Sequence, residues 1–284
     1  ALKYYEKSAN EKFGPAVFIL GDFYYYGFGV DKNYKKAKEY YELAAQYRNS
    51  KANLQLGILY YYGKGFDKDY EKAREYFVKS AKENDINAFY YLAQIYEKGK
   101  GTEIDIEKAI DFYKKCSEKQ DITVTIDYNQ GWTPYSIKNE KFYHSINNLG
   151  LIYLFKYKDF ELADKYFSIV GHNNFPHGKN NNGFFNLFYL NNHSKAFNMF
   201  ESASNDHFSI SEFQLGYMEE KEGRTNLSIG HYQNVLKYEI QYNEIDDEQL
   251  YSSNVFIFCL TNLKLFLFSQ KEDICESNFL INAI

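Results

Sequence analysis

The amino-acid sequence predicts an all-α fold, a solenoid of about seven helix-turn-helix units. Three observations support this prediction. A glycine motif recurs every 36 residues in the first part of the chain, and apolar residues within each repeat have helical spacing. The 284-residue chain also contains only three prolines, which would otherwise interrupt helices.

The recurring glycine motif is a Gly-x-Gly sequence that follows an apolar run. It occurs at Gly27 and Gly29, Gly63 and Gly65, and Gly99 and Gly101. A phosphate-binding loop occurs once per site, and the residues from Gly99 to Thr102 lack the spacing of a P-loop. Because glycine accepts the left-handed conformation that closes many helices, we expect all six glycines to form structural turns.

Each unit is expected to hold two antiparallel helices. In the first complete unit one helix face is predicted to carry Ala16, Leu20, Phe23 and Tyr24. The second helix would then be capped by Asp31 or Asn33. The mid-helix residue Gly21 would let a ring of the neighbouring helix, such as that of Tyr40, come close.

The repeat pattern divides the chain into three parts. Residues 1–119 carry units of period 36, and the first of these is only half a unit, so a preceding helix is expected before Ala1. Residues 120–140 form an insertion. Residues 141–284 carry shorter units of period 33 and a divergent C-terminal helix pair. The shorter units are marked by Gly150, Gly183 and Gly216 on their first helices and by Ala163, Ala196 and Ile229 on their second helices.

The repeated motif resembles a known family. The pattern A-x-x-x-L-G-x-x-Y-x-x-G-x-G, followed by K-A-x-x-Y-[YF]-x-x-[AS]-A, resembles the Sel-1-like repeat, a relative of the tetratricopeptide repeat. The resemblance is strong over residues 1–119 and weaker over 141–240. It implies a right-handed α/α superhelix that serves as a non-catalytic scaffold or adaptor and binds other proteins. The alternative is a regulatory array of a larger signalling enzyme with, for example, a protein kinase domain before Ala1.

Composition and residue spacing exclude several other classes of function. The net charge of −5 argues against a nucleic-acid partner. The three cysteines form no CxxC motif, which favours a reducing compartment and a cytoplasmic location. The apolar run from Val255 to Phe268 is short for a membrane span and contains two polar residues. His172 and His177 lack further ligands for zinc. We therefore expect no metal, no cofactor, no membrane span and no catalytic site.

Two groups of residues are candidates for binding a protein partner. The first group follows the predicted inward ring of Tyr24 or Tyr60 on the first helices. By analogy with tetratricopeptide repeats, it would line a concave groove; partly buried packing is the alternative. This group contains Tyr25, Tyr26, Tyr61, Tyr62, Glu97 and Lys98. The second lies in the insertion, where residues 122–128 alternate as a strand would. It contains Tyr128, Trp132 and Tyr135, in an element that either binds a partner or folds over the helix edge.

Overall fold

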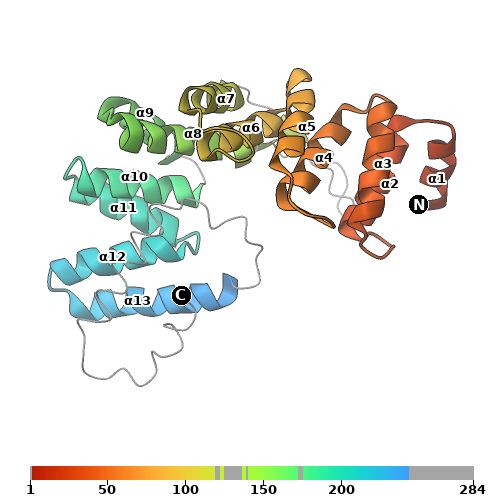
Figure 1. The fold of residues 1–284 in the computed structure, drawn as a ribbon. Coiled ribbons are helices and arrows are strands. Elements are labelled where there is room, and N and C mark those ends of the chain that lie inside the picture. The colour runs from red at the N-terminus through yellow and green to blue at the C-terminus, as the bar shows by residue number, and fades with distance from the viewer. Residues whose placement is uncertain (1, 119–121, 125–135, 139, 172–174, 243–284) are drawn as a thin grey trace. The chain divides into compact units, whose positions relative to one another are not determined.

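The computed structural model describes residues 2–118, 122–124, 136–138, 140–171 and 175–242. These residues form thirteen α-helices, which confirms the all-α prediction (Figure 1). The helices are α1 (Leu2–Asn10), α2 (Gly14–Tyr26), α3 (Tyr34–Gln46), α4 (Ser50–Tyr62), α5 (Tyr70–Lys82), α6 (Ile86–Lys98), α7 (Ile106–Glu118), α8 (Glu140–Ile152), α9 (Phe160–Gly171), α10 (Pro176–Phe188), α11 (His193–Ser204), α12 (Ser209–Lys221) and α13 (Thr225–Tyr242). A short π-helix, η1 (Tyr153–Tyr157), follows α8.

The chain divides into two compact units, residues 1–166 and 167–284. In the first unit each helix from α1 to α7 packs on the next helix along the chain, and α7 packs on α8. In the second unit α10, α11, α12 and α13 pack in the same sequential manner. Contacts between consecutive helices are the arrangement expected of a helical repeat, in which each pair is buried by its neighbours.

The glycines end the first helices of the units of period 36, as predicted. Gly27, Gly63 and Gly99 follow α2, α4 and α6 with positive φ angles of 78°, 66° and 64°. The backbone N–H of Gly27 donates to the carbonyl oxygen of Phe23, which satisfies one of the last carbonyls of the helix. Gly29, Gly65 and Gly101 also have positive φ angles, so the whole turn is built on left-handed backbone. All six glycines are therefore structural turns.

The helix pair at α8 and α9 closes without a glycine. The π-helix η1 widens the last turn after α8, and Lys158 then takes the left-handed conformation with a φ angle of 54°. The backbone N–H groups of Lys158 and Asp159 both donate to the carbonyl oxygen of Tyr153. A lysine in this conformation is strained relative to glycine, so the extra residues of the π-helix replace the Gly-x-Gly turn at some cost.

The second helices begin at short polar side chains. Asn33 caps α3 by accepting a hydrogen bond from the backbone N–H of Lys36, and Asp69 caps α5 in the same way. Both hydrogen bonds measure 3.0 Å. Of the two caps expected for the first unit, Asn33 is therefore the one used. Asp105, which precedes α7, accepts from the backbone of the residue three positions later in the same geometry.

The mid-helix glycines are sites of close packing between paired helices. A Cβ atom added at Gly21 would lie 2.5 Å from the ring of Tyr41, and one added at Gly57 would lie 2.5 Å from the ring of Phe77. The expectation that Tyr40 fills the space beside Gly21 is therefore wrong by one residue. Tyr41 is fully buried, whereas Tyr40 lies beside Tyr24 with its ring stacked at 5.5 Å.

The same packing recurs in the second unit, with one change of register. A Cβ atom at Gly183 would meet the ring of Phe200 at 2.7 Å. In the last pair the buried small residue of the second helix is Ser228, which is 3% exposed, and not the expected Ile229, which is 48% exposed. The sequence spacing fails here because the connection between α12 and α13 is one residue shorter than the one before it.

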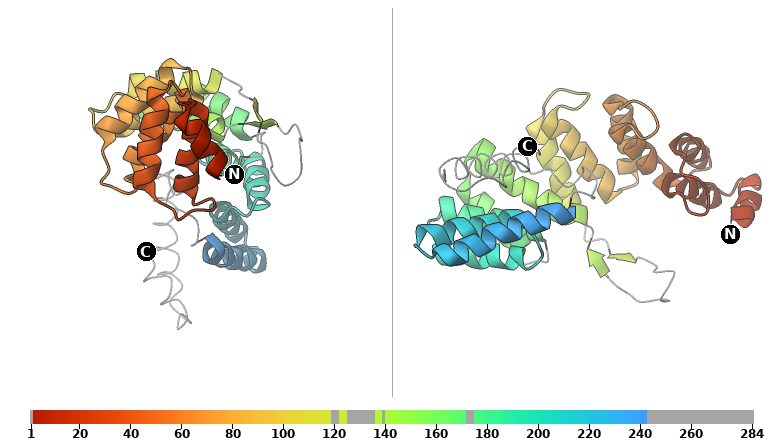
Figure 2. Two further views of the ribbon diagram at one scale, coloured as in Figure 1. Left: turned by 90° about the vertical axis from the view of Figure 1, so that its right-hand side faces the viewer. Right: turned by 90° about the horizontal axis from the view of Figure 1, so that it is seen from below.

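The insertion contains a short antiparallel β-ribbon. Strand β1 (Ile122–Val124) pairs with β2 (Ser136–Lys138), with Ile122 opposite Lys138 (Figure 2). The predicted strand character of the residues after 121 is thus confirmed for β1. Tyr128, Trp132 and Tyr135 lie outside the described residues, so their role as a binding element stays a prediction.

Candidate protein-binding site

Successive first helices of the first unit present one side chain each at the same repeat position. This position comes five residues after the small mid-helix residue, and we call its members the first-helix row. The row consists of Tyr26, Tyr62, Lys98 and Phe155. Tyr26 is 50% exposed and Phe155 is 40% exposed, while Tyr62 and Lys98 are half-buried. Because the helices repeat, Tyr26, Tyr62 and Lys98 hold equivalent positions on α2, α4 and α6, and Phe155 follows in η1 after α8.

Two tyrosine doublets, Tyr25-Tyr26 and Tyr61-Tyr62, each place the first ring in the core and the second ring nearer the surface. Tyr25 and Tyr61 were expected to be accessible, and this expectation is wrong, because they are 8% and 4% exposed. The residue four positions after the small residue turns inward, and Tyr61 accordingly packs edge-on against Phe77. Tyr24, expected as the inward ring, is only half-buried and stacks on a ring of the second helix. Only the second member of each doublet can meet a partner.

The buried tyrosines are bridged to the next repeat by lysines. The ammonium group of Lys64 donates to the hydroxyl of Tyr25 at 3.0 Å, and that of Lys100 donates to the hydroxyl of Tyr61 at 2.8 Å. Both lysines are the middle residues of Gly-x-Gly turns, 36 residues apart. Sequence reasoning treated these turns as backbone features only. The repeated lysine within the turn was the signal that could have identified the bridges.

Buried tyrosine hydroxyls also hold two carboxylates on the first helices. Tyr41 donates to Asp22 at 2.7 Å, and Tyr113 donates to Glu97 at 2.6 Å. Burial raises the pKa of both carboxyls, although the tyrosine hydrogen bonds oppose this rise. Burial likewise lowers the pKa of Lys98. Glu97 and Lys98 were expected at the binding face, and the structure places Lys98 in the first-helix row and Glu97 beside it, facing Tyr113.

The exposed end of the first-helix row is enlarged by a second ring. Phe28 occupies the turn position that Lys64 and Lys100 hold in the following repeats, and it is 59% exposed. Its ring stacks on that of Tyr26 at 5.2 Å, with 23° between the two planes. Two exposed, stacked aromatic rings form an apolar patch at the surface, which is a common feature of protein-binding surfaces.

The described residues include one cysteine whose thiol could suggest nucleophilic catalysis, and its burial argues against that role. Cys116 is fully buried, and burial raises the pKa of its thiol to about 11, so the reactive thiolate is disfavoured. The hydrophobic surroundings of this thiol suit packing. Sequence reasoning named no nucleophile, and this buried cysteine supplies none.

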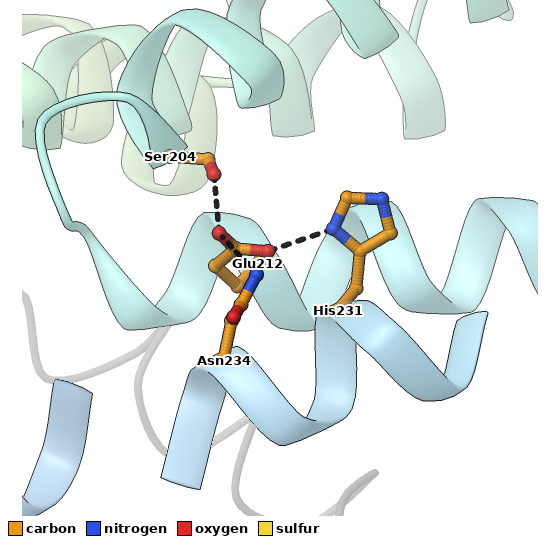
Figure 3. Close-up of polar contacts among 4 residues, drawn as sticks. All are labelled: Ser204, Glu212, His231 and Asn234. Atoms are coloured by element: carbon orange, nitrogen blue, oxygen red, sulfur yellow. Dashed lines mark hydrogen bonds and ion pairs between the residues drawn. The ribbon is translucent and has the colours of Figure 1, made fainter. Parts of the chain in front are cut away.

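A buried carboxylate in the second unit gathers three polar side chains (Figure 3). Glu212, which is 3% exposed, accepts from Ser204 at 2.6 Å and from Asn234 at 3.3 Å, and lies 2.7 Å from Nδ1 of His231. In a serine hydrolase the histidine lies between serine and acid and takes the serine proton. Here the serine donates to the acid directly. The cluster therefore ties α11, α12 and α13 together and does not activate a nucleophile.

Other candidate sites are absent from the part of the chain that the structure describes. No group of three or more His, Cys, Asp or Glu side chains there could hold a metal ion. No described helix combines the length and the apolar character that crossing a membrane requires. An open depression of about 730 Å³ beside α3 is lined by mixed charges, among them Lys38 and Asp69. Opposite charges lining an open surface give no defined ligand chemistry.

Comparisons with known proteins agree with this architecture. The Sel1 repeat family model matches residues 1–13, 14–46, 50–85, 87–121 and 183–206. No curated protein matches the chain. None of the comparisons supports the alternative of an array attached to a protein kinase.

Several solved structures share the fold at low sequence identity. A Sel1 repeat protein from Oxalobacter formigenes is 21% identical with a TM-score of 0.65, covering 86% of this chain and 93% of its own. A protective antigen of uropathogenic Escherichia coli with an SLR fold is 20% identical with a TM-score of 0.64. That match covers 96% of this chain but only 59% of the antigen. The repeat matches and the shared helical-repeat fold show that the chain belongs to the Sel1 repeat family.

Proposed function

We propose that this chain is a non-catalytic scaffold or adaptor that binds segments of other proteins along the first-helix row. The observation that carries the proposal is the pair of exposed, stacked rings of Tyr26 and Phe28 at the start of the row. Aromatic rings supply a large contact area at a low cost in side-chain entropy, and they are frequent among the residues that dominate binding energy. A helical-repeat scaffold holds such rings at fixed spacing.

The arrangement of the row favours an elongated partner segment. The aromatic position of Tyr26 recurs at the half-buried Tyr62 of α4 and at the exposed Phe155 of η1, which follows α8. Inner neighbours such as Tyr61 are buried and hydrogen-bonded, so the row is supported by rigid packing. A peptide lying across several first helices would contact one side chain of the row per repeat, a ring in three of them and Lys98 in the fourth. The cytoplasmic location expected from the cysteine pattern remains part of this proposal.

Peptides selected from a random display library provide the test. Their affinities are to be measured by fluorescence anisotropy for the wild-type protein and for the double variant Tyr26→Ser and Phe28→Ser. We expect the affinity to fall by at least tenfold, because a lost aromatic anchor costs about 2 kcal/mol. The matched control is Phe13→Ser, which removes a ring of similar exposure (56%, against 59% for Phe28) outside the row. Equal losses for both variants would contradict the proposed site.

A further inference from the structure

Lysines lie over tyrosine rings at two repeat positions of the first unit, which form an outer set and an inner set. The outer set consists of Lys36 over Tyr24, Lys72 over Tyr60 and Lys108 over Tyr96, at 5.1, 5.5 and 5.3 Å from the ring centroids. The ammonium groups of Lys72 and Lys108 also form ion pairs with the aspartates that cap their helices, at 2.8 and 2.7 Å. Their positive charge is therefore neutralised within the protein.

Lys100 is the contrasting case beside the first-helix row. It lies over the rings of Tyr61 and Tyr70, at 4.5 and 5.1 Å, and donates to the hydroxyl of Tyr61. Within the described part of the chain no carboxylate pairs with its ammonium group, and the charges that act on it most are those of Lys98 and Lys68. Half-buried positive charge without a counter-charge is costly, and an external anion would relieve that cost.

The repeat places a second lysine in the same relation to the row. Lys64 lies over the rings of Tyr25 and Tyr62, at 5.1 and 5.6 Å. Lys64 and Lys100 therefore form an inner set, and each lies over tyrosine rings of the first unit. The combination of ammonium groups and exposed rings is complementary to a chain that carries both carboxylates and apolar side chains.

We propose that the first-helix row binds acidic protein segments that also contain aromatic or apolar residues, with Lys100 as the principal contact for a partner carboxylate. This inference rests on the proposed function and names the chemical class of its partner. A protein segment fits better than a nucleic acid. A continuous phosphate backbone is bound by many clustered lysines and arginines, whereas here single lysines such as Lys64 and Lys100 stand among tyrosine rings.

The test uses three fluorescent peptides of equal length, made of repeated Glu-Glu-Phe, Gln-Gln-Phe or Lys-Lys-Phe triplets. We expect the glutamate peptide to bind at least tenfold more tightly than the other two, and oligouridylate to bind no better than the glutamine peptide. The variant Lys100→Gln should lose about five- to tenfold in affinity for the glutamate peptide, as charge-assisted contacts generally do on truncation. Lys100→Arg should retain most of it.

Lys108→Gln is the matched control, since it removes a lysine that also covers a tyrosine but is already paired with Asp105. It should leave the affinity for the glutamate peptide unchanged. Burial lowers the pKa of Lys100 to about 8. Between pH 7 and pH 9 the unbound Lys100 loses its proton, so binding must take one up, and the affinity should fall over this range. The decline should be weaker for Lys100→Arg, whose guanidinium stays charged.

Two results would overturn the inference. One is equal affinity for the three peptides, and the other is an equal effect of the Lys100 and Lys108 variants. If library-selected peptides still depend on Tyr26 and Phe28 in that case, the proposed function stands and only the acidic specificity is wrong. If neither the library peptides nor the glutamate peptide binds to the row, the proposed function fails as well.

Discussion

At the scale of single residues, the mid-helix glycines are explained by the rings that press on them. Gly57 and Phe77 approach so closely that a Cβ atom at position 57 would lie 2.5 Å from the ring. Glycine in a helix costs about 1 kcal/mol relative to alanine, and this cost is offset by the close packing of a fully buried ring. Gly230 in α13 is different, because nothing lies within 4 Å of its added Cβ.

The two glycines give opposite predictions for the same substitution. Gly230→Ala should raise the free energy of unfolding by about 1 kcal/mol, because alanine is the better helix former. Gly57→Ala should lower it by about 1 kcal/mol, because the clash with Phe77 exceeds the gain in helix propensity. Urea denaturation followed by circular dichroism measures both. A stabilised Gly57→Ala variant would show that the close approach is not needed.

Residue roles were only partly predictable from the sequence. The glycine turns could be predicted because their function depends on backbone conformation, which the residue type itself indicates. The inward ring could not be identified, because Tyr24, Tyr25 and Tyr26 are chemically identical and adjacent. Their burial is decided by the rotation of the helix against its partner, and a shift of one residue moves a side chain by about 100°.

At the scale of the helices, the turns between pairs contain a repeated feature that the sequence did not reveal. Lys12, Arg48 and Asn84 all have positive φ angles, near 60°, and are spaced 36 residues apart. Each lies two positions before the first residue of the first helix of a pair. The feature was missed because the position carries three different residue types, and only asparagine among them adopts this conformation with ease.

This conformation gives a prediction for two of the turns. Arg48→Gly should raise the free energy of unfolding by up to about 1 kcal/mol, because glycine removes the steric strain of a left-handed residue. Asn84→Gly should change it by less, because asparagine tolerates the same backbone. Thermal or urea denaturation of both variants checks the difference. A destabilised Arg48→Gly variant would contradict the assigned strain.

Helix boundaries could be predicted from the sequence where a capping residue marks the start of the helix. They could not be predicted where the length of the connection between helices changes. Asn33 and Asp69 cap their helices as short polar residues should. The last pair was misaligned by one residue, since Ser228 and not Ile229 is buried. A constant period cannot reveal a connection that is one residue shorter. The π-helix η1 was likewise unpredictable, because no residue type specifies it.

At the scale of the whole molecule, the fold class was the most predictable property. A period of 36 residues repeated over more than 100 residues constrains the architecture strongly, because each repeat must bury its neighbours. The proposed binding site was less predictable. Its position on the first helices came from the repeat pattern, but the charge of this proposed site depends on which lysines have carboxylate partners. That distinction between Lys100 and Lys108 exists only in three dimensions.

The central claim is that partners contact the first-helix row. The most direct measurement replaces Tyr26 with the photo-crosslinking residue p-benzoylphenylalanine and, in a second protein, replaces Tyr76 on α5, a half-buried ring outside the row. After irradiation with a library-selected peptide, the account predicts a crosslinked product from position 26 and little from position 76. Equal crosslinking at both positions, or crosslinking from position 76 alone, would contradict it.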